Sequence, residues 1–187
     1  DGAAAGAEVV FGVIVGTGTG AGIVVRGQIL TGANGIAGEW GHNALPWPDD
    51  DERPGPPCYC GKRGCIETFL SGPGVTADHE RHTARRELPR EIARAADRDD
   101  SAAVATMERY ERRMARALAS VINVLDPDVI VLGGGMSNID RLYENVPRLW
   151  SQWVFAATGP PTDVRSTLVR AKHGDASGVR GAAWLWP

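Results

Sequence analysis

One histidine and three cysteines lie close enough in the sequence to bind a single metal ion. They are His42, Cys58, Cys60 and Cys65, and the chain contains no other cysteine. One imidazole and three thiolates form a complete tetrahedral zinc set, which leaves no coordination position for an activated water. We therefore expect a structural zinc ion rather than a catalytic one.

The alternative for these thiols is redox chemistry. An odd number of cysteines would leave one thiol unpaired, and a disulfide between Cys58 and Cys60 would be strained. One buried thiol beside a redox pair remains the competing interpretation, but the spacing and the nearby histidine favour zinc. Gly61 and Gly64 suit the sharp backbone turns of a metal-binding knuckle.

Two carboxylates flank the cluster. Glu39 comes three residues before His42, and Glu67 comes two residues after Cys65. A metal-stabilised loop would hold both side chains in fixed positions, where they could bind a ligand. The alternative is structural, because Glu39 could pair within the loop and Glu67 could begin the next helix, where an acid is favoured.

Two glycine-rich stretches each follow an apolar run. The first is Gly16-Thr17-Gly18-Thr19-Gly20 and the second is Gly133-Gly134-Gly135. Amides in such turns, or at the start of a helix, can bind an anion. Neither stretch fits the Walker A pattern or the dinucleotide-binding spacing, and a turn that only permits tight packing is the alternative for each. Together with the two carboxylates, they indicate nucleotide-dependent chemistry on a polyhydroxylated substrate.

The elements that would position these residues alternate between strands and helices. Apolar, β-branched runs predict strands at 9–15, 21–26, 28–31, 128–132 and 164–169. Helical spacing predicts a turn at 66–70, a polar helix pair up to about residue 98, and helices at 101–125, 138–155 and 176–186. The helical turn at 66–70 is expected to end at Ser71 to Gly74. The alternation predicts an α/β fold.

Two charged stretches are expected at the surface. Asp49 to Glu52, in a proline-rich loop, are interpreted as a solvated acidic turn. Basic residues between Arg81 and Arg98 alternate with acids, which favours a solvent-facing, salt-bridged helix pair over a phosphate-binding patch.

Composition limits the classes of function. The chain has 187 residues, 43% of them hydrophobic, which is enough for one domain with a core. A net charge of −3 gives no reason to expect a nucleic-acid or membrane surface, and no apolar run approaches the roughly 20 residues of a membrane helix. Free thiols at zinc spacing fit a reducing cytoplasm. The chain opens at Asp1 and its methionines are Met107, Met114 and Met136, so we expect part of a longer protein.

The segment Glu39-Trp40-Gly41-His42, together with Cys58-Tyr59-Cys60-Gly61-Lys62-Arg63-Gly64-Cys65-Ile66-Glu67, resembles the ROK family of bacterial sugar kinases and related repressors. The resemblance extends through 16–22, 126–135 and 173–183, and so covers nearly the whole chain. Within the family, 41–48, the long loop before Cys58, and 68–72 look most like the fructokinase and mannokinase branch.

The resemblance implies an actin-like, ribonuclease-H-like kinase of two lobes, with sugar and ATP meeting between them. Residues 1–187 look like the C-terminal lobe, with 39–67 as a zinc-binding insertion. By this resemblance, zinc would be bound by His42, Cys58, Cys60 and Cys65, and sugar hydroxyls by Glu39, His42 and Glu67. ATP phosphates would lie at Gly16, Thr17, Gly18, Thr19, Gly20 and Gly22, and adenosine at Gly133, Gly134 and Gly135.

The family's first phosphate loop and its catalytic aspartate would both lie before Asp1. Phosphoryl transfer depends on positioning and charge stabilisation, so we assign no catalytic residue here and expect the chain alone to be inactive. The function implied for the whole protein is magnesium- and ATP-dependent phosphorylation of a hexose at its 6-hydroxyl, with fructose as first choice. A homodimer is expected, since relatives commonly pair through this lobe. The alternatives are a non-catalytic zinc-braced module for assembly or weak sugar binding, and the effector domain of a ROK repressor.

Overall fold

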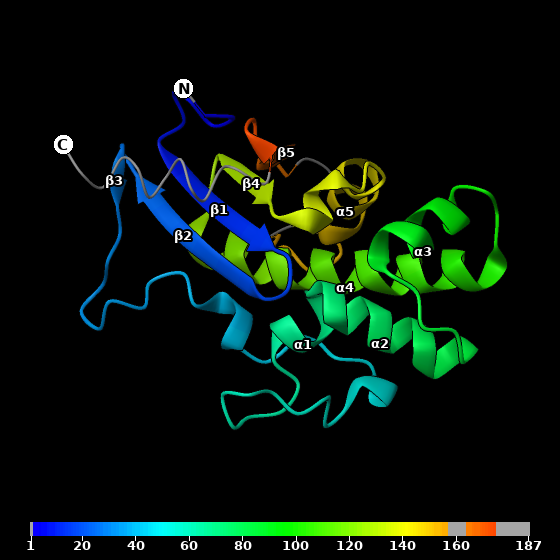
Figure 1. The fold of residues 1–187 in the computed structure, drawn as a ribbon. Helices are drawn as coiled ribbons and strands as arrows, with labels where there is room; N and C mark the ends of the chain where they lie inside the picture. Colours follow the sequence, from blue (N-terminus) through cyan, green and yellow to red (C-terminus); the bar gives the residue numbers. More distant parts are fainter. Residues whose placement is uncertain (1, 157–163, 175–187) are drawn as a thin grey trace.

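A computed structural model describes residues 2–156 and 164–174. Within them the order of elements is β1 (Val9–Val15), β2 (Thr19–Val25), β3 (Gln28–Ile29), η1 (Trp40–His42), η2 (Asp50–Glu52), α1 (Ile66–Leu70), α2 (Gly72–Thr83), α3 (Pro89–Ala96), α4 (Ser101–Leu125), β4 (Val129–Gly133), η3 (Gly135–Asn138), α5 (Leu142–Trp150) and β5 (Thr167–Arg170). The predicted α/β class is confirmed (Figure 1). The helix predicted at 176–186 lies outside the described residues.

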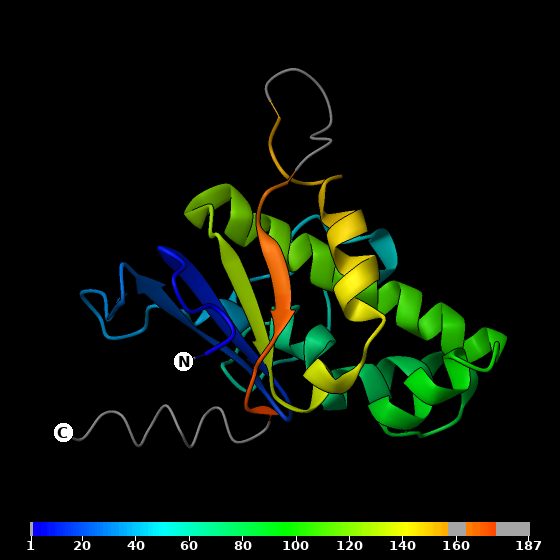
Figure 2. The same ribbon diagram turned by 90° about the horizontal axis from the view of Figure 1, so that it is seen from above.

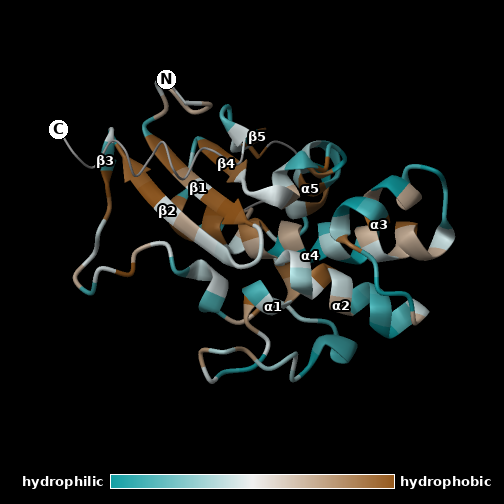
Figure 3. Cartoon of the chain, in the orientation of Figure 1, coloured by the Kyte–Doolittle hydropathy of each residue, from teal (hydrophilic) through white to brown (hydrophobic). Residues whose placement is uncertain are grey.

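The strands form one mixed sheet in the order β3-β2-β1-β4-β5. β1 and β2 make an antiparallel hairpin, whereas β4 runs parallel to β1 and β5 runs parallel to β4. Phe11, Val13 and Val15 alternate with more exposed residues, so one face of β1 faces the core. Figure 3 shows this concentration of apolar residues along β1, β2 and β4.

Helix α4 supplies the other side of the core. Its buried residues include Met107, Tyr110, Met114 and Leu118, as the helical spacing predicted. The Asp100 carboxylate caps the helix by accepting bonds from the first backbone amides. Figure 2 shows α4 beside α5 on one side of the strands. Among the described residues, no helix is both long and apolar enough to cross a bilayer.

The predicted end of the first helix is confirmed, since α1 stops at Leu70 and a second helix follows. The break is shorter than expected, because α2 already begins at Gly72. The Ser71 hydroxyl accepts a bond from the Gly74 amide at 3.2 Å, and Pro73 occupies the first turn, where its missing N–H costs nothing. The same residues that break one helix therefore start the next.

The second glycine stretch also differs from expectation. Gly133 is the last residue of β4, and Gly135 opens a 3-10 helix of four residues rather than a long helix. Gly134 has φ +78°, and a Cβ there would lie 2.5 Å from the Val15 carbonyl oxygen. Only glycine suits that position, because both the backbone angle and the close approach to β1 exclude a side chain.

The interpretation of Asp49 to Glu52 as a solvated turn is wrong for Glu52, which is 6% exposed. Its carboxylate pairs with Arg113 at 2.6 Å and with Arg116 at 2.7 Å, and both arginines are buried on α4. Arg113 also pairs with Asp78 of α2 at 2.9 Å. The helix pair is therefore not purely solvent-facing, since α2 buries Asp78 inside a charged network.

This network joins three parts of the chain: the loop before the cysteines, α2 and α4. Burial alone would raise the pKa of Glu52, but the hydrogen bond from Arg113 and the nearby arginine charges hold it below its usual value. For Asp78, burial alone would again raise the pKa, but the charge of Arg113 outweighs it and the pKa is lowered. Both carboxylates are thus held ionised inside the protein.

Replacing Glu52 by glutamine should destabilise the fold by about 3 kcal/mol, because it leaves buried arginine charge without its partner. The measurement is urea unfolding at neutral pH, with exposed Asp51→Asn as the control and a change below about 0.5 kcal/mol expected for it.

The same comparison has a predicted pH dependence. The pKa of Glu52 is lower in the folded state than its ordinary value of 4.5. The contribution of its carboxylate to the free energy of unfolding is therefore fully present above pH 4.5, and it is lost as the pH falls through the folded-state pKa. The gap between wild type and Glu52→Gln should therefore narrow in acid. A gap that stays constant down to about pH 3 would contradict this assignment.

Candidate functional site

The four predicted metal ligands converge in the structure. Donor atoms of His42, Cys58, Cys60 and Cys65 all lie within 4.8 Å of one another. The Cys60 and Cys65 sulfurs are 3.6 Å apart, and the Cys58 sulfur is 3.5 Å from Nδ1 of His42. Tetrahedral zinc with bonds of about 2.3 Å would space its sulfurs about 3.8 Å apart. The donor set therefore fits a zinc ion in both chemistry and spacing.

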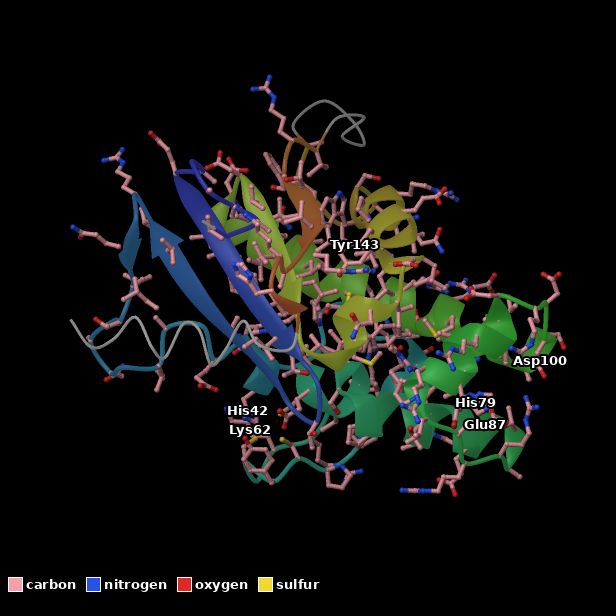
Figure 4. All side chains as sticks on the ribbon, turned by 45° about the horizontal axis from the view of Figure 1, so that its top comes forward. His42, Lys62, His79, Glu87, Asp100 and Tyr143 are labelled. Carbon is pink, nitrogen blue, oxygen red and sulfur yellow. The ribbon has the colours of Figure 1, made fainter. Side chains whose placement is uncertain are left out.

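A tight backbone turn brings the cysteines together. The Cys58 amide donates to the Lys62 carbonyl at 2.9 Å, and the Gly61 amide donates to the Cys58 carbonyl at 3.0 Å. Gly61 and Gly64 have φ of +86° and +69°, the region in which glycine is favoured. His42 reaches the turn from η1, and Figure 4 shows His42 and Lys62 together at this end of the molecule.

The thiols have opposite electrostatic environments. A hydrogen bond from the Lys62 backbone lowers the pKa of the exposed Cys60 thiol to about 7. Burial, followed by the neighbouring thiols, raises the pKa of Cys65 to about 12. Three thiolates this close repel one another, so all three can ionise together only around a cation.

Tyr59, between two of the cysteines, was not predicted to have a role. Its hydroxyl lies 2.8 Å from Nε2 of His42, and the two rings meet edge to face with centroids 5.0 Å apart. Loss of water contacts, followed by the charge of Glu67, raises the pKa of the phenol, and Glu39 adds to the effect. Tyr59 therefore contacts His42 on the nitrogen opposite the one that lies near Cys58.

Glu67 and Glu39 are held differently. Oε2 of Glu67 accepts the Thr19 amide at 2.8 Å, which ties α1 to the first glycine stretch. Glu39 is exposed and immediately precedes η1, the turn that carries His42. Glu67 lies in the first turn of α1, as the structural alternative expected, and its carboxylate also anchors that helix to the glycine turn.

The first glycine stretch is the turn of the β1–β2 hairpin. The Gly16 amide donates to the Gly18 carbonyl at 2.9 Å, and the Gly16 carbonyl accepts the Gly72 amide from the start of α2 at 2.7 Å. Gly41, next to His42, packs so closely that a Cβ would lie 2.1 Å from the Thr19 carbonyl oxygen. The turn is therefore in contact with α2 on one side and with the histidine segment on the other.

A cavity of about 1140 Å³ opens beside this turn. Three of the predicted cofactor-binding residues line it: Gly16, Thr17 and Gly135. The others, namely Gly18, Thr19, Gly20, Gly22, Gly133 and Gly134, are not in its wall. The two glycine stretches meet at one cavity because β1 and β4 are parallel neighbours whose ends adjoin.

Sequence reasoning missed most of the remaining cavity wall. It comes from the start of α2 (Gly72, Pro73, Thr76), from residues 86–91 before and at the start of α3, from Ala93 and Arg94 of α3, from Asp97 just after it, and from Met136 and residues 138–141 after β4. Only the arginine content of 81–98 could have suggested this region, and that pattern indicated a solvated helix pair instead.

Comparisons with known proteins identify the family. The family model "ROK family" matches residues 1–187. An N-acetyl-D-glucosamine kinase of Erwinia tasmaniensis is 40% identical over 181 residues, which cover 95% of this chain and 58% of that protein. The chain therefore spans somewhat more than half the length of the curated relatives that it matches.

Solved structures agree with this result. A ROK hexokinase from Thermus thermophilus is 32% identical with a TM-score of 0.80, covering 97% of this chain and 58% of that one. A ROK glucokinase from Streptomyces griseus, solved with glucose and AMPPNP, is 25% identical with a TM-score of 0.82. The match covers 98% of this chain and 62% of that one. The sugars named for these relatives give no support to the expected preference for fructose. The family resemblance itself is confirmed: the chain belongs to the ROK family.

Proposed function

We propose that the protein containing this chain is an ATP-dependent hexose kinase and that residues 1–187 form its C-terminal lobe. The observation that carries this proposal is the position of residues 16–19, which form the β1–β2 turn and the first residue of β2. Gly16 and Thr17 line the large cavity, while the Thr19 amide is bonded to Glu67 beside the cysteine cluster. This arrangement supports a nucleotide site in the cavity next to a sugar site at the carboxylates, the proximity that transfer of a phosphoryl group to a sugar requires.

The cysteine cluster serves this function as a structural zinc site. His42, Cys58, Cys60 and Cys65 would hold the ion, which has no position left for a substrate water. Zinc would fix the turn that precedes Glu67 and the histidine segment that follows Glu39. These two carboxylates then have defined positions from which to accept hydrogen bonds from sugar hydroxyls.

The cavity would hold ATP with magnesium. Beside Gly16, Thr17 presents a backbone amide and a hydroxyl to phosphate, and the dipole of α2 favours an anion at this end of the cavity. Gly135 leaves open space in which a flat base can approach the backbone. The groups supplied by this chain bind and orient; the aspartate that accepts the sugar proton is proposed to lie upstream of Asp1.

Two observations favour different acceptors. The names of the relatives favour N-acetyl-D-glucosamine or glucose. The motifs at 41–48 and 68–72 favour fructose or mannose. All are hexoses with a primary hydroxyl at carbon 6, so the reaction is the same. A hexose kinase explains why the cavity and the carboxylates adjoin, which an assembly module would not require. The homodimer expected from the resemblance stays a prediction.

The purified chain should contain about one zinc ion per molecule, measured by elemental analysis. Cys60→Ser should lower this content and lower the unfolding midpoint, because one of the four ligands is lost. Asp51→Asn is the control and should keep its metal. Well-folded protein without metal would refute the zinc site.

Gly135→Leu should weaken binding of ATP with magnesium by about tenfold or more, because the new side chain would fill space beside the cavity wall. A Cβ at Gly135 meets no atom within 4 Å, so the backbone has room for a side chain to start there, and the unfolding midpoint of the variant checks that the fold is kept. Gly20→Ala is the control, since that position is equally open and outside the cavity. Calorimetric titration gives both affinities. Equal binding by the two variants would show that the nucleotide lies elsewhere.

A coupled assay with ATP, magnesium and four hexoses tests the activity. We expect turnover only when the upstream lobe is present, because the proton acceptor is proposed to lie there. The ratio of kcat/KM for N-acetyl-D-glucosamine and fructose decides between the two acceptor assignments. Robust turnover by the 187 residues alone would refute the missing-base argument, and no turnover on any hexose with both lobes would refute the kinase.

A further inference from the structure

Tyr59 has no part in the function proposed above, yet its position is specific. The side chain is 84% exposed, so burial does not explain where it lies. Its described contacts are both with His42: the hydroxyl lies 2.8 Å from Nε2, and the rings meet at an interplanar angle of 89°. An exposed aromatic ring held against a single imidazole indicates a role connected with that imidazole.

The two nitrogens of His42 have different surroundings. Nδ1 faces the cluster and lies 3.5 Å from the Cys58 sulfur, whereas Nε2 faces the Tyr59 hydroxyl. A neutral imidazole carries one ring proton, and a metal can bind only the nitrogen that lacks it. If Nδ1 binds the metal, the proton is on Nε2 and the Tyr59 oxygen must accept it.

We propose that Tyr59 is a positioning residue for the metal site, whose hydroxyl oxygen accepts the Nε2–H of His42 and keeps the Nδ1 lone pair directed at the three sulfurs. Residues that bond the second nitrogen of a metal-binding histidine fix the orientation of its ring and strengthen it as a ligand. Here the partner comes from the knuckle itself, one residue from Cys58 and one from Cys60. The turn that brings the thiols together therefore also orients the imidazole.

The proposal has a consequence for the sugar site. With Nε2 bonded to Tyr59, a sugar hydroxyl can reach this nitrogen only by displacing the phenol or by bonding to the phenol instead. The phenol can do the latter, because an oxygen that accepts the histidine proton still has its own O–H to donate. Tyr59 then stands between His42 and the solvent-facing side of the site.

Tyr59→Phe tests the proposal because it removes the hydroxyl and keeps the ring. We expect zinc affinity, measured by competition with a chelator, to fall about tenfold. In the zinc-loaded variant, the ¹⁵N resonance of His42 Nε2 should also move upfield from its wild-type position, since its hydrogen bond is lost. Tyr143→Phe is the control, because its hydroxyl donates to the Ser137 carbonyl at 2.7 Å, and it should change neither value.

The proposal rests on the metal site proposed above, and the experiment separates the two. Failure of the wild-type chain to bind zinc would refute the metal site itself. Zinc binding by wild type, with either the affinity or the Nε2 resonance unchanged in Tyr59→Phe, would overturn the role of Tyr59 alone. A change confined to packing cannot produce the expected pair of results, because phenylalanine preserves the edge-to-face contact.

Discussion

The hydrogen bond from the Thr19 amide to Oε2 of Glu67 connects the two halves of the candidate site. Thr19 begins β2, directly after the turn that lines the cavity, and Glu67 lies in the first turn of α1, two residues after the last cysteine. The bond also limits Gly18, where a Cβ would lie 2.8 Å from the same carboxylate oxygen. The Glu67 carboxylate thus links the cysteine cluster to the glycine turn, alongside the close packing of Gly41 against Thr19.

The buried network around Glu52 holds this assembly against the helices. It fastens the loop that leads to the cysteines to Arg113 and Arg116 of α4 and, through Arg113, to Asp78 of α2. α2 also begins at the cavity, where the Gly72 amide bonds the Gly16 carbonyl. The loop and the cavity wall therefore share a rigid support, which is what positioning two substrates demands.

Sequence reasoning succeeded where local pattern decides structure. The apolar alternation of β1, the stripe along α4 and the spacing of the cysteines each depend on residues close together in the chain. Sequence reasoning failed where residues far apart in the chain determine burial or line the cavity. Glu52 is buried because of arginines 61 and 64 positions away, and most of the cavity wall comes from helices that meet only in the fold. Tyr59 lacked any signal, because its partner His42 lies across the knuckle.

Hydrogen exchange at the Thr19 amide tests most directly whether the metal site and the glycine turn form one unit. The account predicts slow exchange in the zinc-loaded chain and faster exchange after chelation, because loss of the metal frees α1 and with it the Glu67 carboxylate. An exchange rate at Thr19 that stays the same when zinc is removed would contradict the account, since the turn would then hold its shape without the metal knuckle.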